Sequence, residues 1–305
     1  MCGYRSICSV TSDIWSVLSD RITATTGQSF LIRQHVPVSG GCISQAWKVS
    51  DGQRDYFVKV NDSVSLTLFE AEAAGLAELA ASQAVRVPEP VCWGSIGRRA
   101  YLVLEYLPLV SGSRRAMARL GQQLAVLHAQ PQPYFGWHRD NWIGATPQPN
   151  DRCDDWIAFW RDRRLGFQLD LAARNGYTGT IQRHGEKLRS RVAGLFTGYR
   201  LRPSLLHGDL WGGNIGCVAT GEPVIFDPAV YYGDREADLA MTELFGGFPV
   251  EFYAAYREAL PLDVGYLQRR TLYNLYHVLN HLNLFGGGYL AQAERMMGQL
   301  VGELG

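Results

Sequence analysis

The sequence has no run of about eighteen apolar residues, the length that a membrane-spanning helix needs. Its first ten residues also lack the apolar core of a signal peptide. Charge of one sign is not in excess either, because 29 basic residues balance 29 acidic ones. We therefore expect no nucleic-acid or membrane partner, and we expect a cytoplasmic protein.

Cysteine is scarce as well. The six cysteines are too scattered for a disulfide scaffold or a CxxC metal site, so we predict reduced thiols. No internal repeat is present. The 305 residues exceed the usual size of one hydrophobic core, which predicts two lobes.

Two apolar stretches each end in a polar motif, and these motifs predict the chemistry. LLHGDLWGGNIG (205–216) contains Asp209 and Asn214, and PVIFDPA (223–229) contains Asp227. Residues 220–222 between them predict the turn of a hairpin whose second strand leads to Asp227. A phosphotransferase needs one aspartate to accept the proton of the attacking hydroxyl, then an asparagine and a second aspartate to hold Mg²⁺. Any one of the three is equally explained as a turn former. Together, at these intervals, they predict Mg²⁺-dependent phosphoryl transfer from ATP.

At these motifs the sequence resembles the fructosamine (ketosamine) kinases, a branch of the aminoglycoside phosphotransferase and choline kinase group. HGD and FDP occur across the larger group, whereas Trp211 and the run GDREADLA (233–240) indicate this branch. The resemblance extends from about residue 12 to residue 302 and includes FGWHRDNWIG and TPQPN. It implies an α+β, two-lobed protein-kinase-like fold. We expect a small β-rich N-lobe over residues 1–105 and a helical C-lobe over residues 106–305. In the C-lobe, apolar periodicity predicts a helix over 114–129, and residues 134–150 are interpreted as an aromatic and polar loop.

The first lobe contains candidates for holding the nucleotide phosphates. Gly40, Gly41 and Cys42 lie in a glycine turn that could present backbone N–H groups to phosphates, although hairpins of this kind usually bind nothing. Lys59, in the apolar strand 56–60, resembles the lysine that pairs with phosphates in kinases. A strand lysine is otherwise usually an edge residue.

Two further elements complete the predicted nucleotide site. A helix is predicted over 66–81, and the family pattern FxxE favours Glu72 over Glu70 as the partner of Lys59. The buried strand 100–104 then leads into an interlobe hinge. There the backbone of Leu104, Glu105 and Tyr106 would bind adenine, a task that many side chains permit.

Several residues are candidates for contacts with the acceptor. The resemblance implies a ketosamine, free or attached to a protein, which is phosphorylated at its third carbon so that the amine is freed. Trp211 and Tyr231 could pack against the sugar, and Asp234 and Glu236 could pair with the amine near the pocket mouth. Asp238 is predicted to be structural, as a cap of the catalytic loop.

Two other functions stay open at this point. A kinase of the same fold could act on an aminoglycoside or choline, and Trp211 with the GDRE set argues for ketosamines without excluding these acceptors. A nucleotide-binding module without turnover is the second alternative, but such a module has no need of a base such as Asp209. A peptide acceptor is not expected, because the sequence has no Ala-Pro-Glu motif and no long activation segment.

Overall fold

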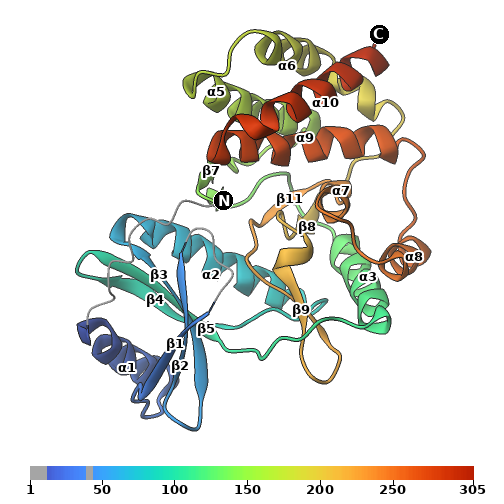
Figure 1. The fold of residues 1–305 in the computed structure, drawn as a ribbon. Coiled ribbons are helices and arrows are strands. Elements are labelled where there is room, and N and C mark those ends of the chain that lie inside the picture. Colours follow the sequence, from blue (N-terminus) through green and yellow to red (C-terminus); the bar gives the residue numbers. More distant parts are fainter. Residues whose placement is uncertain (1–11, 39–43) are drawn as a thin grey trace. The chain divides into compact units, whose positions relative to one another are not determined.

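The computed structural model describes residues 12–38 and 44–305. The chain divides into two compact units (Figure 1). Unit 1 consists of Met1–Ala81 and Val87–Leu109, and unit 2 consists of Ser82–Arg86 and Val110–Gly305. Within the described ranges, no helix combines the length and the apolar character needed to cross a membrane.

Unit 1 is built on an antiparallel five-stranded sheet with the order β1-β2-β3-β5-β4. Its helices α1 and α2 both pack against β4. The apolar side of α1, including Trp15, Leu18 and Ile22, is buried against alternate residues of the sheet such as Val58 and Val60. Its elements are β1 (Gln34–Val38), β2 (Gln45–Ser50), β3 (Asp55–Asp62), β4 (Pro90–Ile96), β5 (Arg99–Glu105), α1 (Ser12–Thr26), the 3₁₀ turn η1 (Ser63–Ser65) and α2 (Leu66–Ala81).

Lys59 belongs to the central part of this sheet. Strand β3 pairs with β2 on one side and β5 on the other, so Lys59 lies opposite both Ala46 and Leu102. It is therefore not an edge residue, the usual place of a lysine in a sheet.

Unit 2 is mainly helical. Ser113 caps α3 by accepting a hydrogen bond from the Ala116 N–H, and the largely buried α9 packs against α5, α7 and α10. Its helical segments are α3 (Arg114–Ala129), α4 (Trp156–Phe159), the π-helix η2 (Trp160–Gly166), α5 (Phe167–Arg174), α6 (Thr180–Arg191), η3 (Val192–Phe196), η4 (Gly212–Asn214), α7 (Glu236–Leu244), α8 (Val250–Ala259), α9 (Tyr266–Phe285), η5 (Gly287–Tyr289) and α10 (Leu290–Glu303).

Three short antiparallel strand pairs accompany these helices. Strand β8 pairs with β11, β9 with β10, and β6 with β7. Their bounds are β6 (Asn141–Ile143), β7 (Thr146–Gln148), β8 (Ser204–Leu206), β9 (Ile215–Cys217), β10 (Pro223–Ile225) and β11 (Tyr231–Gly233). The loops that follow β8 and β10 carry the motifs recognised in the sequence.

The helices predicted over 66–81 and 114–129 are confirmed with these bounds. The hairpin predicted before Asp227 is also present, because β9 and β10 pair around a turn closed by a hydrogen bond from the Gly221 N–H to the Val218 carbonyl. The stretch 134–150, interpreted from the sequence as a loop, instead contains the β6–β7 hairpin.

Candidate active site

The predicted catalytic loop, which carries Asp209 and Asn214, begins directly after the buried strand β8. Its first two backbone N–H groups, from His207 and Gly208, donate to the two carboxylate oxygens of Asp238 at 2.7 and 2.8 Å. Asp238 lies in the first turn of α7 and is itself buried. The prediction that Asp238 caps the catalytic loop is therefore confirmed.

His207, for which the motif predicted no role, joins the two motif loops. Its imidazole is buried, and burial lowers its pKa, so the neutral ring can both donate and accept. Nε2 lies 3.0 Å from the Phe226 carbonyl, and Nδ1 accepts a hydrogen bond from the Asp209 N–H at 3.2 Å. The histidine thus connects the residue before Asp227 with Asp209.

Glycine is required at position 208. Its φ is +81°, and a Cβ atom at this position would collide with the Ala229 carbonyl. The backbone after Asp227 therefore touches the backbone before Asp209. Only a residue without a side chain permits this approach.

The three residues predicted to carry the chemistry come together in unit 2. The side-chain amide of Asn214 donates to the Asp209 carbonyl at 2.9 Å and to Asp209 Oδ2 at 3.2 Å. The same amide lies 3.5 Å from the Asp227 carbonyl, and the Phe226 N–H donates to the Asn214 carbonyl at 3.0 Å. Asp227 has a φ of +57°, a left-handed conformation that is uncommon for a residue with a side chain.

The charges of this cluster suit a bound cation. Burial, together with the nearby negative charge of Asp227, raises the pKa of Asp209 to about 7. Asn214 and Asp227 supply an amide oxygen and a carboxylate, hard oxygen donors of the kind that Mg²⁺ prefers. Because Asn214 directs its nitrogen to Asp209, its Oδ1 is left available for a metal. A divalent ion would offset the repulsion between the two carboxylates.

In unit 1, Lys59 forms the ion pair expected for a phosphate-binding lysine. Its Nζ lies 2.7 Å from Glu72 Oε1, and both side chains are largely buried. Glu72 extends from α2, so the pair links the central strand β3 to this helix. The glutamate in contact with Lys59 is the one favoured by the FxxE pattern.

The other nucleotide-site candidates are less constrained by the structure. Leu104 is buried at the end of β5, and the Glu105 N–H donates to the Glu89 carbonyl at 2.8 Å. Lys48 Nζ lies 4.7 Å from the centre of the Tyr106 ring. Adenine binding by this segment stays a prediction. Gly40, Gly41 and Cys42 lie outside the described residues, so their phosphate contact also stays a prediction.

The structure does not support substrate contacts by Asp234 and Glu236. Both carboxylates are buried, and both already have partners inside unit 2. Asp234 accepts hydrogen bonds from the hydroxyls of Tyr199 at 2.9 Å and Tyr273 at 2.5 Å, and Glu236 accepts two from Arg269 at 2.7 and 3.1 Å. The sequence indicated carboxylates at a pocket mouth, but Glu236 links α7 to α9, and Asp234 links the turn before α7 to α9.

Tyr231 is a second correction. Its ring is 2% exposed, stacks on Trp156 and lies 4.2 Å from the Arg164 guanidinium, so it cannot pack against a sugar in this structure. Aromatic residues near a motif are more often core residues than ligand contacts, and Tyr231 follows that rule.

Trp211 remains exposed, as a substrate-binding aromatic residue should be. It is 38% exposed, and its ring lies across Gly213, where a Cβ atom would collide with it. Two further rings lie beside it. The ring centre of Trp211 lies 6.1 Å from that of Phe245, which lies 4.9 Å from that of His281. His281 donates from Nδ1 to the His277 carbonyl, and burial lowers its pKa. We call Trp211, Phe245 and His281 the aromatic row.

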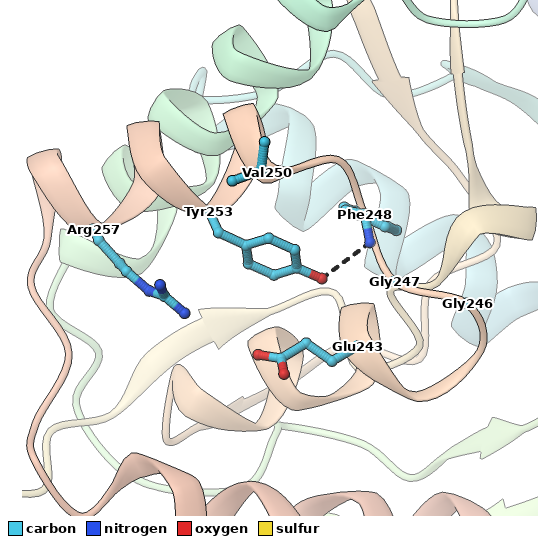
Figure 2. A pocket seen from close by; sticks show the side chains of 7 residues that line it. All are labelled: Glu243, Gly246, Gly247, Phe248, Val250, Tyr253 and Arg257. Atoms are coloured by element: carbon cyan, nitrogen blue, oxygen red, sulfur yellow. Dashed lines mark hydrogen bonds between the residues drawn. The ribbon is translucent and has the colours of Figure 1, made fainter.

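A separate hollow of about 420 Å³ lies between α7 and α8 (Figure 2). Glu243 and Arg257 border the Tyr253 ring there, and the Tyr253 hydroxyl accepts a hydrogen bond from the Phe248 N–H at 3.0 Å. None of the residues singled out in the sequence lines it, and we assign it no part in the chemistry.

A buried carboxylate that caps the loop carrying Asp209, with an aspartate–asparagine–aspartate cluster beyond it, is the arrangement expected of a kinase. The solved choline kinase from Streptococcus pneumoniae has the same protein-kinase-like fold, with a TM-score of 0.63, 12% identity and coverage of 96% of this chain and 100% of that one. A family model described as fructosamine kinase matches residues 14–303. The chain belongs to the fructosamine kinase family.

Relatives of known sequence and structure lie in the same family. A Synechocystis protein named probable ketoamine kinase is 50% identical over 286 residues, which are 93% of this chain and 96% of the relative. The chloroplastic protein-ribulosamine 3-kinase of Arabidopsis thaliana is 42% identical, over 88% of this chain and 83% of the relative. A crystal structure from Haemophilus somnus, provisionally named fructosamine-3-kinase, has a TM-score of 0.86 and 30% identity, with coverage of 94% and 97%.

Proposed function

We propose that this enzyme transfers the γ-phosphoryl group of ATP to the 3-hydroxyl of a ketosamine, either free or attached to a protein. The observation that carries the proposal is the cluster of Asp209, Asn214 and Asp227 at the ends of two neighbouring strand pairs. Membership of the fructosamine kinase family and the names of its ribulosamine and ketoamine kinase relatives support the acceptor class. A cytoplasmic location belongs to the same proposal.

Asp209 is the proposed general base. A pKa of about 7 places this carboxylate near the operating pH. At that pH a substantial fraction of the base is ionised, and it is still basic enough to accept a proton. Asn214 and Asp227 would hold Mg²⁺, which neutralises charge on the transferring phosphoryl group. With the ion bound, the pKa of Asp209 would fall because a positive charge favours the carboxylate.

Lys59 would position the nucleotide phosphates in unit 1. The ion pair with Glu72 fixes the ammonium group in a largely buried place, where its charge is poorly screened by solvent. The turn containing Gly40, Gly41 and Cys42 would cover the phosphates, and the backbone of residues 104–106 would bind adenine.

The aromatic row would receive the acceptor. Trp211 follows Asp209 by two residues and offers an exposed ring face, against which a sugar or the substituent of the amine can pack. A protonated amine would also gain from the negative face of the indole ring. Because the carboxylates of Asp234 and Glu236 are paired inside unit 2, this attraction replaces the ion pair expected from the sequence.

The test is ATP consumption with Mg²⁺ against a fructosyl-amine, a ribulosyl-amine, an aminoglycoside and choline. We expect turnover with the ketosamines only. Phosphorylation at the third carbon would destabilise the adduct and free the amine, which makes the reaction a deglycation step. Turnover with only the aminoglycoside or choline would overturn the acceptor class, and binding of ATP without turnover on any acceptor would favour a nucleotide-binding module.

Trp211→Leu tests the acceptor site separately. We expect a rise of about tenfold in KM for the ketosamine, because stacking and cation–π contacts of this kind contribute about 1–2 kcal/mol. The KM for ATP should stay within twofold. A matched control is Trp93→Leu, another exposed tryptophan, which belongs to unit 1. Equal effects of the two substitutions would contradict an acceptor contact by Trp211.

A further inference from the structure

The β6–β7 hairpin and the residues directly after it carry three side-chain amides that are almost completely enclosed. Asn141, Gln148 and Asn150 are 4%, 1% and 0% exposed. Burying a primary amide costs free energy unless its donors and acceptor are bonded, and an apolar side chain would fill the same space without that cost. The hydrogen-bond partners of these amides therefore show which part of the structure the hairpin fixes in place.

Two of the amides bond to the backbone that follows Asp227. The Asn141 amide donates to the Val230 carbonyl at 2.7 Å, and the Gln148 amide donates to the Ala229 carbonyl at 3.1 Å. Ala229 and Val230 come directly after Asp227 and Pro228. The hairpin thus holds the segment between the proposed metal ligand and β11.

The orientation of both amides is fixed by further bonds. Asn141 Oδ1 accepts from Gln148 Nε2 and from Asn150 Nδ2, each at 2.8 Å. Gln148 Oε1 accepts from the Tyr276 hydroxyl at 2.7 Å, and Asn150 Oδ1 accepts from Arg164 at 2.6 Å. Neither Asn141 nor Gln148 can turn its amide without breaking several hydrogen bonds.

The backbone that these amides hold is one that needs support. The left-handed conformation of Asp227 costs free energy, which the surrounding structure must supply. On the opposite side of the segment, the Ala229 N–H donates to the His207 carbonyl at 2.8 Å. Ala229 is therefore held at its N–H by the catalytic loop and at its carbonyl by the hairpin.

We propose that Asn141 and Gln148 are positioning residues, which fix the carbonyls of Ala229 and Val230 and thereby aim the Asp227 carboxylate at the metal. The inference rests on the metal role proposed above for Asp227. Groups that orient a metal ligand in this way typically change metal affinity or activity by about 10–100-fold when they are replaced. The hairpin is then part of the metal site although it supplies no ligand.

The experiment measures how much Mg²⁺ strengthens ADP binding, by calorimetry with and without the metal. The variant is Gln148→Met, which has similar volume and loses the bonds to Ala229 and Asn141. We expect the strengthening by Mg²⁺ to fall about tenfold. Metal-free ADP binding should stay within twofold, because it does not use the Asp227 carboxylate.

Gln168→Met is the matched control. Gln168 is also a fully buried glutamine of unit 2, but its amide bonds reach Asn280 and Asn283 of α9. We expect this variant to keep the wild-type effect of Mg²⁺, even if its melting temperature falls as much as that of Gln148→Met. An equal loss of the Mg²⁺ effect in both variants would show a general packing defect and overturn the proposal.

Asp227→Asn separates the two proposals. If it leaves the Mg²⁺ effect unchanged, the metal role of Asp227 fails and the positioning inference fails with it. If it removes the effect while Gln148→Met keeps it, only the positioning inference is overturned. Should Gln148→Met not fold, Tyr276→Phe carries the test, since it removes the hydroxyl that donates to Gln148 Oε1 and keeps the ring. There we expect about a threefold loss of the Mg²⁺ effect, and no loss would overturn the inference.

Discussion

Unit 2 contains two groups of buried carboxylates that are close in sequence and differ in their hydrogen-bond partners. Asp209 and Asp227, the proposed catalytic pair, repel one another, and burial together with this repulsion raises the pKa of Asp209 to about 7. Asp234, Glu236 and Asp238, the anchor carboxylates, each accept hydrogen bonds from tyrosine, arginine or backbone donors. The partners of a carboxylate, rather than its place in a motif, distinguish a reactive acid from a structural one.

The largest expected effect is that of Asp209→Asn in the catalytic pair. We expect kcat to fall about 10²–10⁴-fold, because the base is lost. The melting temperature without Mg²⁺ should not fall, since the substitution removes a partly desolvated charge next to Asp227. Steady-state ADP release and thermal unfolding measure the two quantities. A clear loss of stability would move Asp209 into the anchor group and break the comparison.

Asp238→Ala, at an anchor carboxylate, should clearly lower the stability of the fold, unlike Asp209→Asn. Its removal leaves the N–H groups of His207 and Gly208 and the Nε2 atom of His128 without their buried partner. We expect the free energy of unfolding to fall by about 3–5 kcal/mol in urea titrations at pH 7. Asp170→Ala, at an exposed carboxylate of α5, is the control, with an expected change of about 0.5 kcal/mol or less.

Arg269→Met tests how the anchor group depends on pH. Burial raises the pKa of Glu236 to about 7 although Arg269 lowers it, so removal of the arginine raises it further. The folded state then holds a proton on Glu236 that the unfolded state releases above its ordinary pKa of 4.5. Stability conferred by this proton is complete below that value and is lost as the pH rises through the folded-state pKa.

We therefore expect Arg269→Met to cost about 3 kcal/mol at pH 8 and clearly less at pH 6, where Glu236 is neutral. Unfolding by urea at the two pH values measures the difference. The double variant with Glu236→Gln should be less destabilised at pH 8 than the single one. Equal losses at both pH values would contradict the raised pKa of Glu236.

Tyr199→Phe should give the smallest effect. It removes one of the hydrogen bonds to Asp234 and keeps the ring that lies against Arg269. We expect a loss of about 1 kcal/mol in stability and a kcat within twofold of wild type. A large fall in kcat at unchanged stability would return Asp234 to the substrate site.

The sequence predicted the local elements well because their signals are local. The helices over 66–81 and 114–129 follow from apolar periodicity, and the hairpin before Asp227 from two apolar runs around a turn. The capping role of Asp238 could be predicted because a known fold places an acid there. These features depend on residues that are neighbours in the chain or belong to one motif.

The errors concern side chains whose environment is set by distant residues. Asp234 is enclosed by Tyr273, 39 residues away, and Glu236 by Arg269, 33 residues away, and no local pattern reveals such partners. The β6–β7 hairpin was missed because each of its strands has only three residues, too few to show alternation. The paired polar residues Asn141 and Gln148 were visible, but their targets lie more than 80 residues ahead.

The short segment Ser82–Arg86 belongs to unit 2, although unit 1 precedes and follows it in the chain. The Arg86 carbonyl accepts a hydrogen bond from the Ile225 N–H at 3.0 Å, beside β10 and two residues before Asp227. The two units are therefore not separate blocks of the gene. A crossover between related genes near residue 109 would take residues 82–86 from one parent and β10 from the other. The segment that bonds to β10 would then come from a different parent than β10 itself. Recombination should consequently preserve residues 82–86 and β10 from the same parent.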